Sequence, residues 1–212
     1  MKAYKLTDEK GQTKNKTQWG INVTHSASGS SKELCTDGWI HFYMDPRIAV
    51  LMNPAHAGFV NPILWECETS GEELHEALKS GCKTLTTIKE IDLPVIAINS
   101  KIAFGILCAK KVCSDLEWNT WADNWLAGKD RTAAAATNAA KYAAAAAYAA
   151  DAAKYAADAA YAAADAAYAA AAAAHAAAKY AAYAAAYAAA YNRKMLTVSD
   201  FIEIANQAML VE

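Results

Sequence analysis

The chain has 212 residues, a formal net charge of −2 and five cysteines. Near-neutral charge and only three arginines argue against a dedicated nucleic-acid binder, because arginine is the side chain best suited to bidentate phosphate and guanine contacts. The cysteines form no CxxC pair and no His/Cys cluster at zinc spacing, so we expect reduced thiols, no metal and no cofactor. The opening segment lacks an apolar signal core, and we therefore expect a cytoplasmic protein.

The composition changes sharply near Lys129. All six tryptophans and all four prolines lie before that residue, whereas 41 of the 59 residues at 133–191 are alanine. We predict an α+β fold class, with a small mixed domain at 1–113 and an all-helical region at 114–212. That second region contains the alanine-rich tract at 132–191 and a C-terminal helix at 198–211. Lysines and aspartates interrupt the tract too often for a membrane span.

Short strands and helices alternate in the first region. The segments "AYKLT", "WGINVT" and "WIHFYM" (39–44) read as strands because they are rich in aromatic and β-branched residues between turn signals. Asp45 followed by Pro46 predicts the start of a helix, which Asn53-Pro54 should end. The segment "PILWECE" then predicts a further strand.

Helix signals recur further along the chain. Ser70 and Glu73 form a capping box for a predicted helix, "EELHEALK", with Gly81 as its stop. "KTLTTIKEI" alternates like a strand, and "KIAFGILCAKKVC" is apolar nearly all round, as in a buried helix. Ser114 and Glu117 make a second capping box.

Three tryptophans share one face of the helix that this second box predicts: Trp118, Trp121 and Trp125. We interpret this stripe as core, or as a lid between the two regions, rather than as a ligand site. Gly128 ends that helix, and Asp130 or Thr132 caps the alanine-rich tract. Thr197 with Asp200 opens the last amphipathic helix.

Alanine has the highest intrinsic helix propensity, so the tract should be helical. On a helical wheel, one arc is almost pure alanine and another carries tyrosines. Burying a methyl group yields little, so an alanine face gains stability mainly by letting a neighbouring helix approach closely. The neighbour could be the tryptophan-bearing helix, the C-terminal helix, another part of the tract, or a second copy of the chain.

The tyrosines of the tract predict an interface, because tyrosine is large and rigid with a polar tip. The interface residues that we select are Tyr148, Tyr155, Tyr180, Tyr183, Tyr187 and Tyr191. The main functional hypothesis is a non-enzymatic protein-interaction module or self-associating oligomer. Intramolecular cover of the first domain and a structural rod or virion component are alternatives. Ice binding is disfavoured because threonine does not recur along the tract.

One enzymatic alternative rests on the first region. His41 and Tyr43 in "WIHFYMD", followed by Glu68 in "LWECE", resemble the ADP-ribosyltransferase pattern. The resemblance implies NAD binding, with a strand aromatic stacked on nicotinamide and a glutamate contacting the ribose. Tyr4 and Lys5 stand where those families place His or Arg. No Gly-rich phosphate loop, HExxH or GxSxG motif is present.

The segments "WADNWLAGKDRTAAAATNAA" and "HFYMDPRIAVLMNPAHA" resemble a group of uncharacterised bacterial and bacteriophage proteins. In that group a W-L-x-G-K-D-R segment leads into an alanine-rich helical tract. The resemblance spans most of the chain and implies a viral or mobile-element context, with modulation of a host system as the expected role. It supplies no activity and no site.

Overall fold

The structure is a computed structural model that describes residues 2–76, 78–111, 113, 115–139 and 196–211. Residue contacts divide the chain into two compact units, Met1–Val95 with Thr197–Ile202 and Ile96–Leu196 with Glu203–Glu212. The division predicted from composition differs from this one because it assigned residues 96–113 to the first region. The fold class is α+β.

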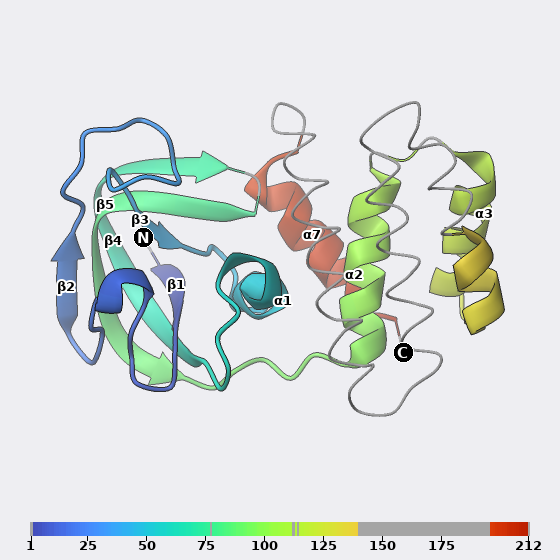
Figure 1. The fold of residues 1–212 in the computed structure, drawn as a ribbon, viewed down its shortest axis with the longest axis horizontal. Helices are drawn as coiled ribbons and strands as arrows, with labels where there is room; N and C mark the ends of the chain where they lie inside the picture. Colours follow the sequence, from blue (N-terminus) through green and yellow to red (C-terminus); the bar gives the residue numbers. More distant parts are fainter. Residues whose placement is uncertain (1, 77, 112, 114, 140–195, 212) are drawn as a thin grey trace. The chain divides into compact units, whose positions relative to one another are not determined.

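The first unit contains a five-stranded antiparallel sheet (Figure 1). Its path runs β1-β4-β5-β2, and β3 pairs with β5 beside β2. The strands are β1 (Lys2–Thr7), β2 (Val23–Ser26), β3 (Ile40–Phe42), β4 (Ile63–Glu76) and β5 (Lys79–Ile91). Tyr43, just after β3, exchanges two backbone hydrogen bonds with Tyr4 of β1, so the sheet curls around its core.

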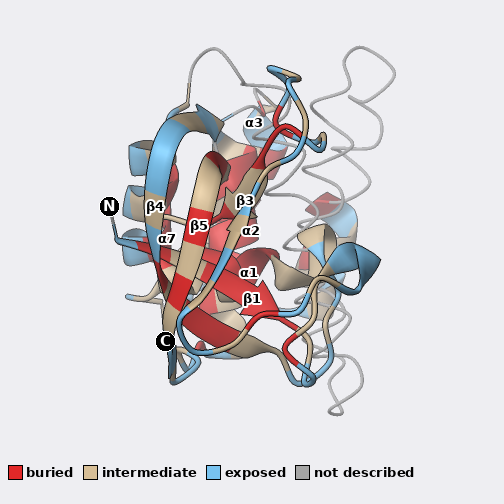
Figure 2. Ribbon diagram, turned by 90° about the vertical axis from the view of Figure 1, so that its left-hand side faces the viewer, coloured by how far each residue is buried: buried red, intermediate tan, exposed pale blue. Residues whose placement is uncertain are grey.

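Side chains on one face of the strands point into the core of the sheet and fill it. Ala3 and Trp65 pack in one buried cluster with Trp19, Phe42, Cys67, Cys82 and Leu85. A second cluster joins Leu6 and Leu64 to Ala49 of helix α1 (Pro46–His56). Buried residues run along β1 and α1 in Figure 2, whereas part of β4 is exposed. The predicted strands 39–44 and "AYKLT" are therefore present, although β3 and β2 are shorter than predicted.

Helix α1 begins where the sequence predicts, because the Asp45 side chain accepts a hydrogen bond from the Arg47 amide at 2.8 Å. The predicted stop at Asn53-Pro54 is wrong. Pro54 lies in the last turn, where a missing N–H removes only one hydrogen bond. The helix ends instead at His56, and Gly58, two residues later, has φ +69° and donates its amide to the Asn53 carbonyl. A short 3-10 turn, η1 (Lys14–Lys16), lies in the loop before β2.

The predicted helix "EELHEALK" is also wrong, because the segment belongs to the end of β4 and the start of β5. Glu73, Leu74 and His75 pair in register with Cys82, Gly81 and Ser80. A neighbouring strand satisfies the backbone groups that the capping box would have directed into a helix. The Glu73 carboxylate accepts a hydrogen bond from the Thr69 hydroxyl at 2.5 Å.

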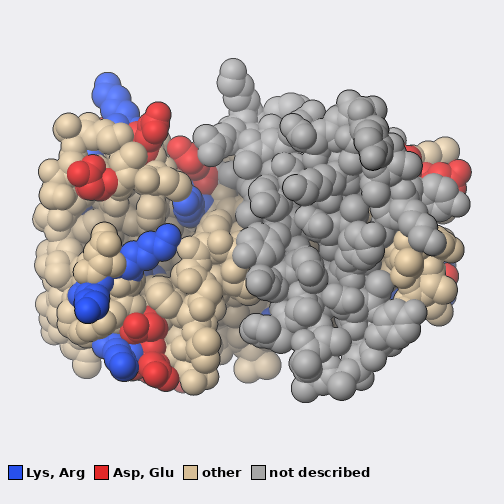
Figure 3. Space-filling model, viewed as in Figure 1, with Lys and Arg blue, Asp and Glu red and all other residues tan. Residues whose placement is uncertain are grey.

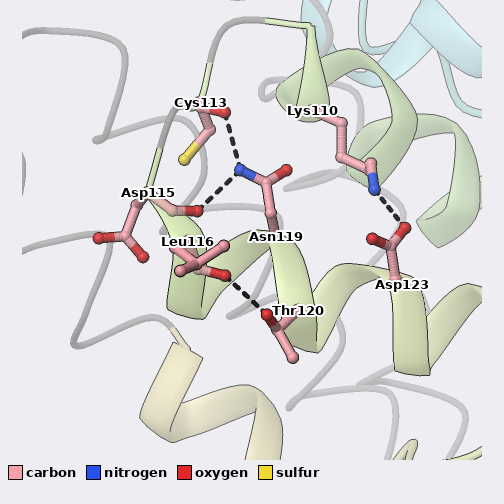
Figure 4. Close-up of polar contacts among 7 residues, drawn as sticks. All are labelled: Lys110, Cys113, Asp115, Leu116, Asn119, Thr120 and Asp123. Carbon is pink, nitrogen blue, oxygen red and sulfur yellow. Dashed lines mark hydrogen bonds and ion pairs between the residues drawn. The ribbon is translucent and has the colours of Figure 1, made fainter.

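The second unit contains α2 (Ile98–Lys110) and α3 (Leu116–Leu126). Asp115 caps α3 by accepting from the Trp118 amide at 2.7 Å. Figure 4 shows how the two helices are joined: Lys110 forms an ion pair with Asp123, and the Asn119 amide donates to the Cys113 carbonyl at 2.9 Å. Ser114, the predicted cap, lies outside the described residues.

The alanine-rich tract starts as predicted. Asp130 accepts from the Thr132 amide at 2.9 Å, and the Thr132 hydroxyl accepts from the Ala135 amide at 3.3 Å. Residues 133–139 are helical, with Ala136 and Ala139 buried. The remainder of the tract lies outside the described residues.

The C-terminal helix α7 (Val198–Ala208) is the amphipathic helix predicted at this end. Thr197 donates its amide and its hydroxyl to the Asp200 carboxylate, at 2.6 and 2.7 Å. Its buried positions are Phe201, Ile204, Ala205 and Ala208. Their spacing is that of a single helix face.

Candidate functional site

His41 lies in β3 opposite Gly81, and its Nε2 is 2.5 Å from the Leu34 carbonyl oxygen. Burial lowers the pKa of His41, although the Leu34 carbonyl favours its charged form. A side chain at position 81 would meet Leu34 Cδ1 at 2.5 Å and Trp39 Cβ at 2.9 Å. The absence of a Cβ at Gly81 therefore lets the loop carrying Leu34 lie against the sheet and hold the imidazole.

The Tyr43 hydroxyl lies 3.0 Å from Nδ1 of His56 in α1, and the two rings are nearly parallel at 13°. Burial lowers the pKa of His56 to about 4, and the charges of Lys79 and His41 act in the same direction. Burial also raises the pKa of Tyr43. At neutral pH the phenol therefore donates and the neutral imidazole accepts.

Glu68, the third residue of the enzymatic alternative, is exposed on β4 opposite Lys2 and Thr86. Along β5, Thr86 is five residues from Gly81, the partner of His41. At a rise of ~3.4 Å per residue this separation is about 17 Å. The structure therefore brings Tyr43 and His56 together but leaves Glu68 apart from His41.

The burial of Lys5 in β1 is a feature that the sequence patterns did not predict. Lys5 is 8% exposed, and its Nζ donates to the His41 carbonyl at 2.8 Å while lying 4.6 Å from the centre of the Trp19 ring. Burial lowers its pKa to about 8. Its position two residues after the buried Ala3 in an alternating strand was the signal that could have revealed it.

Two thiols lie near this amine. Burial raises the pKa of Cys67 to about 12 and that of Cys82 to about 11, although the Lys5 cation opposes both shifts. At neutral pH both groups are therefore protonated thiols, which are poor nucleophiles and poor metal ligands. This cluster is enclosed in the interior of the sheet, and its neutral thiols offer no activated nucleophile.

The second unit contains a groove of about 210 Å³ between α3 and the start of the alanine-rich tract. Its lining includes Glu117, Thr120, Trp121, Asn124, Asp130, Ala135 and Ala139. Trp121 is buried, and its indole N–H has no hydrogen-bond partner in the described part of the chain. A buried N–H without an acceptor is unfavourable, so this indole nitrogen lowers the stability of the second unit.

The tryptophan stripe itself is core, as the sequence analysis favoured. Trp118 and Trp125 are almost fully buried, and the Trp125 ring is covered by the Arg131 guanidinium at 4.8 Å. Arg131 also donates to the Trp125 carbonyl at 3.1 Å. These contacts fix the start of the tract beside α3, which was one of the neighbours proposed for it.

The six tyrosines selected as an interface, Tyr148, Tyr155, Tyr180, Tyr183, Tyr187 and Tyr191, lie outside the described residues. On the described part of the face in Figure 3, Lys and Arg side chains are interspersed with Asp and Glu. In the described ranges no three His, Cys, Asp or Glu side chains are grouped so that they could hold a metal ion.

No helix among the described residues is both long enough and apolar enough to cross a membrane. Comparison with known proteins gives no family to which the chain can be assigned. It matches no protein-family model, no curated protein and no solved structure.

Proposed function

We propose that this protein is a non-enzymatic protein-interaction module, whose binding surface is the tyrosine-bearing face of the alanine-rich tract at 132–191, within an all-helical region at 114–212. The observation that carries the proposal is the described start of that region. Ala136 and Ala139 are buried there while Thr132, Ala134 and Asn138 are exposed, so the face that carries Ala136 and Ala139 is directed inward from the first turn. A tract that continued this arrangement would present its larger side chains on other faces.

The interior of the first unit also favours a non-enzymatic role. The groups that could do chemistry there are engaged within the fold: His41 with the Leu34 carbonyl, Tyr43 with His56, and Lys5 with the His41 carbonyl. Each of these contacts holds two parts of the curled sheet together.

The partner in this proposal is a protein of a bacterial host, or a second copy of the chain. The host partner follows from the resemblance of the "WLAGKDR" junction to bacteriophage proteins. The described start of the tract supports a protein partner because its groove combines an apolar floor at Trp121 with polar groups at Asn124 and Asp130. That combination is typical of protein interfaces.

The test replaces Tyr148, Tyr155, Tyr180 and Tyr187 together with serine. Light scattering reports self-association, and a pull-down from host lysate reports partner binding. The matched control replaces Tyr142, Tyr161 and Tyr168, which lie elsewhere in the tract. We expect the first variant to lose assembly or binding and the control to keep it, with circular dichroism unchanged in both. Unchanged assembly and binding in the first variant would refute the proposal.

A further inference from the structure

An exposed cysteine and a lysine meet at one end of the first unit, apart from the groups discussed above. Cys35 is the exposed thiol among the five cysteines, and Lys79 begins β5. The Lys79 Nζ lies 2.8 Å from the Cys35 Sγ. This distance is shorter than the roughly 3–3.5 Å at which reacting atoms are held for attack.

The backbone holds both residues in place. Leu34, next to Cys35, is 1% exposed, and its carbonyl oxygen accepts a hydrogen bond from the His41 imidazole at 2.5 Å. Lys79 pairs with Glu76 across the β4–β5 turn. The contact between Cys35 Sγ and Lys79 Nζ therefore joins a loop that is anchored in the core to the first residue of β5.

We propose that Cys35 and Lys79 form an oxidative modification site, in which a peroxide converts the pair into a covalent sulfur–nitrogen crosslink. The Cys35 sulfur attacks one oxygen of hydrogen peroxide, the O–O bond breaks, and a sulfenic acid and one water form. The Lys79 ammonium group releases one proton to solvent, and the amine so formed attacks that sulfur; the S–N bond forms, and the sulfenic oxygen leaves as a second water with one hydrogen from the amine. One peroxide is reduced, and the sulfur is oxidised by two electrons.

The other thiols are protected from the same reaction. Cys67, Cys82, Cys108 and Cys113 are buried, and burial raises the pKa of each. Oxidation by peroxide requires an accessible sulfur with thiolate character. The reaction is therefore directed to Cys35.

The crosslink also changes the electrostatics of the first unit. Burial is the main cause of the lowered pKa values of His56 and His41, and the positive charge of Lys79 lowers both further. A sulfenamide nitrogen carries no such charge, so the crosslink would move the pKa of His56 upward from about 4. The crosslink would thus join the loop to the strand covalently and change the pKa of the buried His56.

The test treats the full chain with a small excess of hydrogen peroxide and analyses tryptic peptides by mass spectrometry. We expect peptides containing Cys35 and Lys79 to be joined, with a mass two hydrogens below their sum, and tryptic cleavage after Lys79 to be lost. Dithiothreitol should restore both peptides. Lys79→Arg keeps the charge without the amine and should leave Cys35 as a sulfenic acid that dimedone labels.

Lys83→Arg is the matched control, because Lys83 lies on the same strand but donates to the Gly38 carbonyl at 2.8 Å. It should crosslink as the wild type does, and circular dichroism should show all variants folded. The proposal is overturned if oxidised wild type is still cleaved after Lys79 and its dimedone labelling equals that of Lys79→Arg. A crosslink from Cys35 to any other lysine would overturn it as well.

Discussion

The Tyr43 hydroxyl and the His56 Nδ1, 3.0 Å apart, join the end of β3 to the last turn of α1. Both groups are neutral at physiological pH because burial lowers the pKa of His56 and raises that of Tyr43. Their hydrogen bond therefore depends on a neutral imidazole. Acid breaks it by protonating His56.

The first prediction concerns acid stability. The pKa of His56 falls from 6.5 to about 4 on folding, so the unfolded chain binds more protons between these values. The stability contribution of neutral His56 is fully present above pH 6.5 and is lost as pH falls towards 4. We expect His56→Asn to reduce the slope of unfolding free energy against pH in this window by up to about 1.4 kcal/mol per pH unit. Urea unfolding across a pH series measures it, and equal slopes would contradict it.

The second prediction concerns stability at alkaline pH, which depends on Lys5. Its pKa falls from 10.5 to about 8 on folding, so the charged amine destabilises the fold at pH 7 and the penalty disappears as pH rises from 8 to 10.5. We expect Lys5→Met to raise the free energy of unfolding at pH 7 by about 1–3 kcal/mol and to remove the rise at alkaline pH. Denaturant unfolding at pH 7 and 10 tests both. A less stable Met variant at pH 7 would show that the contacts with His41 and Trp19 outweigh the burial of the charge.

Gly81 is predicted to tolerate no side chain. A Cβ there would lie 2.5 Å from Leu34 Cδ1, so Gly81→Ala should lower the free energy of unfolding by about 1–3 kcal/mol. Gly20→Ala is the matched control, because its Cβ would meet only Val23 Cγ2 at an ordinary 3.6 Å. Thermal unfolding of both variants measures the difference. Equal melting temperatures would mean that the Leu34 loop moves aside freely.

The groove predicts an unusual response at Trp121. Its buried indole N–H lacks an acceptor among the described residues, so Trp121→Phe removes an unfavourable group. We expect the free energy of unfolding to stay constant or rise by about 1 kcal/mol. Trp125→Phe should instead lose about 0.5–1 kcal/mol, because the Arg131 guanidinium covers that ring. A fall at Trp121 larger than at Trp125 would contradict this account of the groove.

The separation of Glu68 from His41 predicts that NAD does not bind to the arrangement of His41, Tyr43 and Glu68. His41 lies opposite Gly81 of β5, and Glu68 lies opposite Thr86 of the same strand. These two positions are five residues apart, which is too far for both side chains to contact one nicotinamide ribose. We expect no binding heat when NAD is titrated into the folded protein. Measurable heat that disappears in both Tyr43→Phe and Glu68→Gln would show that the three residues act together.

The sequence alone determined the features that depend on neighbours along the chain. The caps at Asp45, Thr132 and Thr197 were predictable because each bonds within a few residues. Strand β1 and residues 83–91 of β5 were predictable because their residue patterns are local. The packing of the tryptophan stripe followed from its spacing on one helix face.

Tertiary structure decided the rest. The segment after Ser70 satisfies a helix capping box, yet it is a strand because β5 offers a full set of backbone partners along it. The contact of Tyr43 with His56 joins residues 13 positions apart, and the contact of Cys35 with Lys79 joins residues 44 positions apart. Lys5 is buried because several strands enclose its charge. No pattern within one segment contains such contacts, since they exist only when the sheet curls and brings distant segments together.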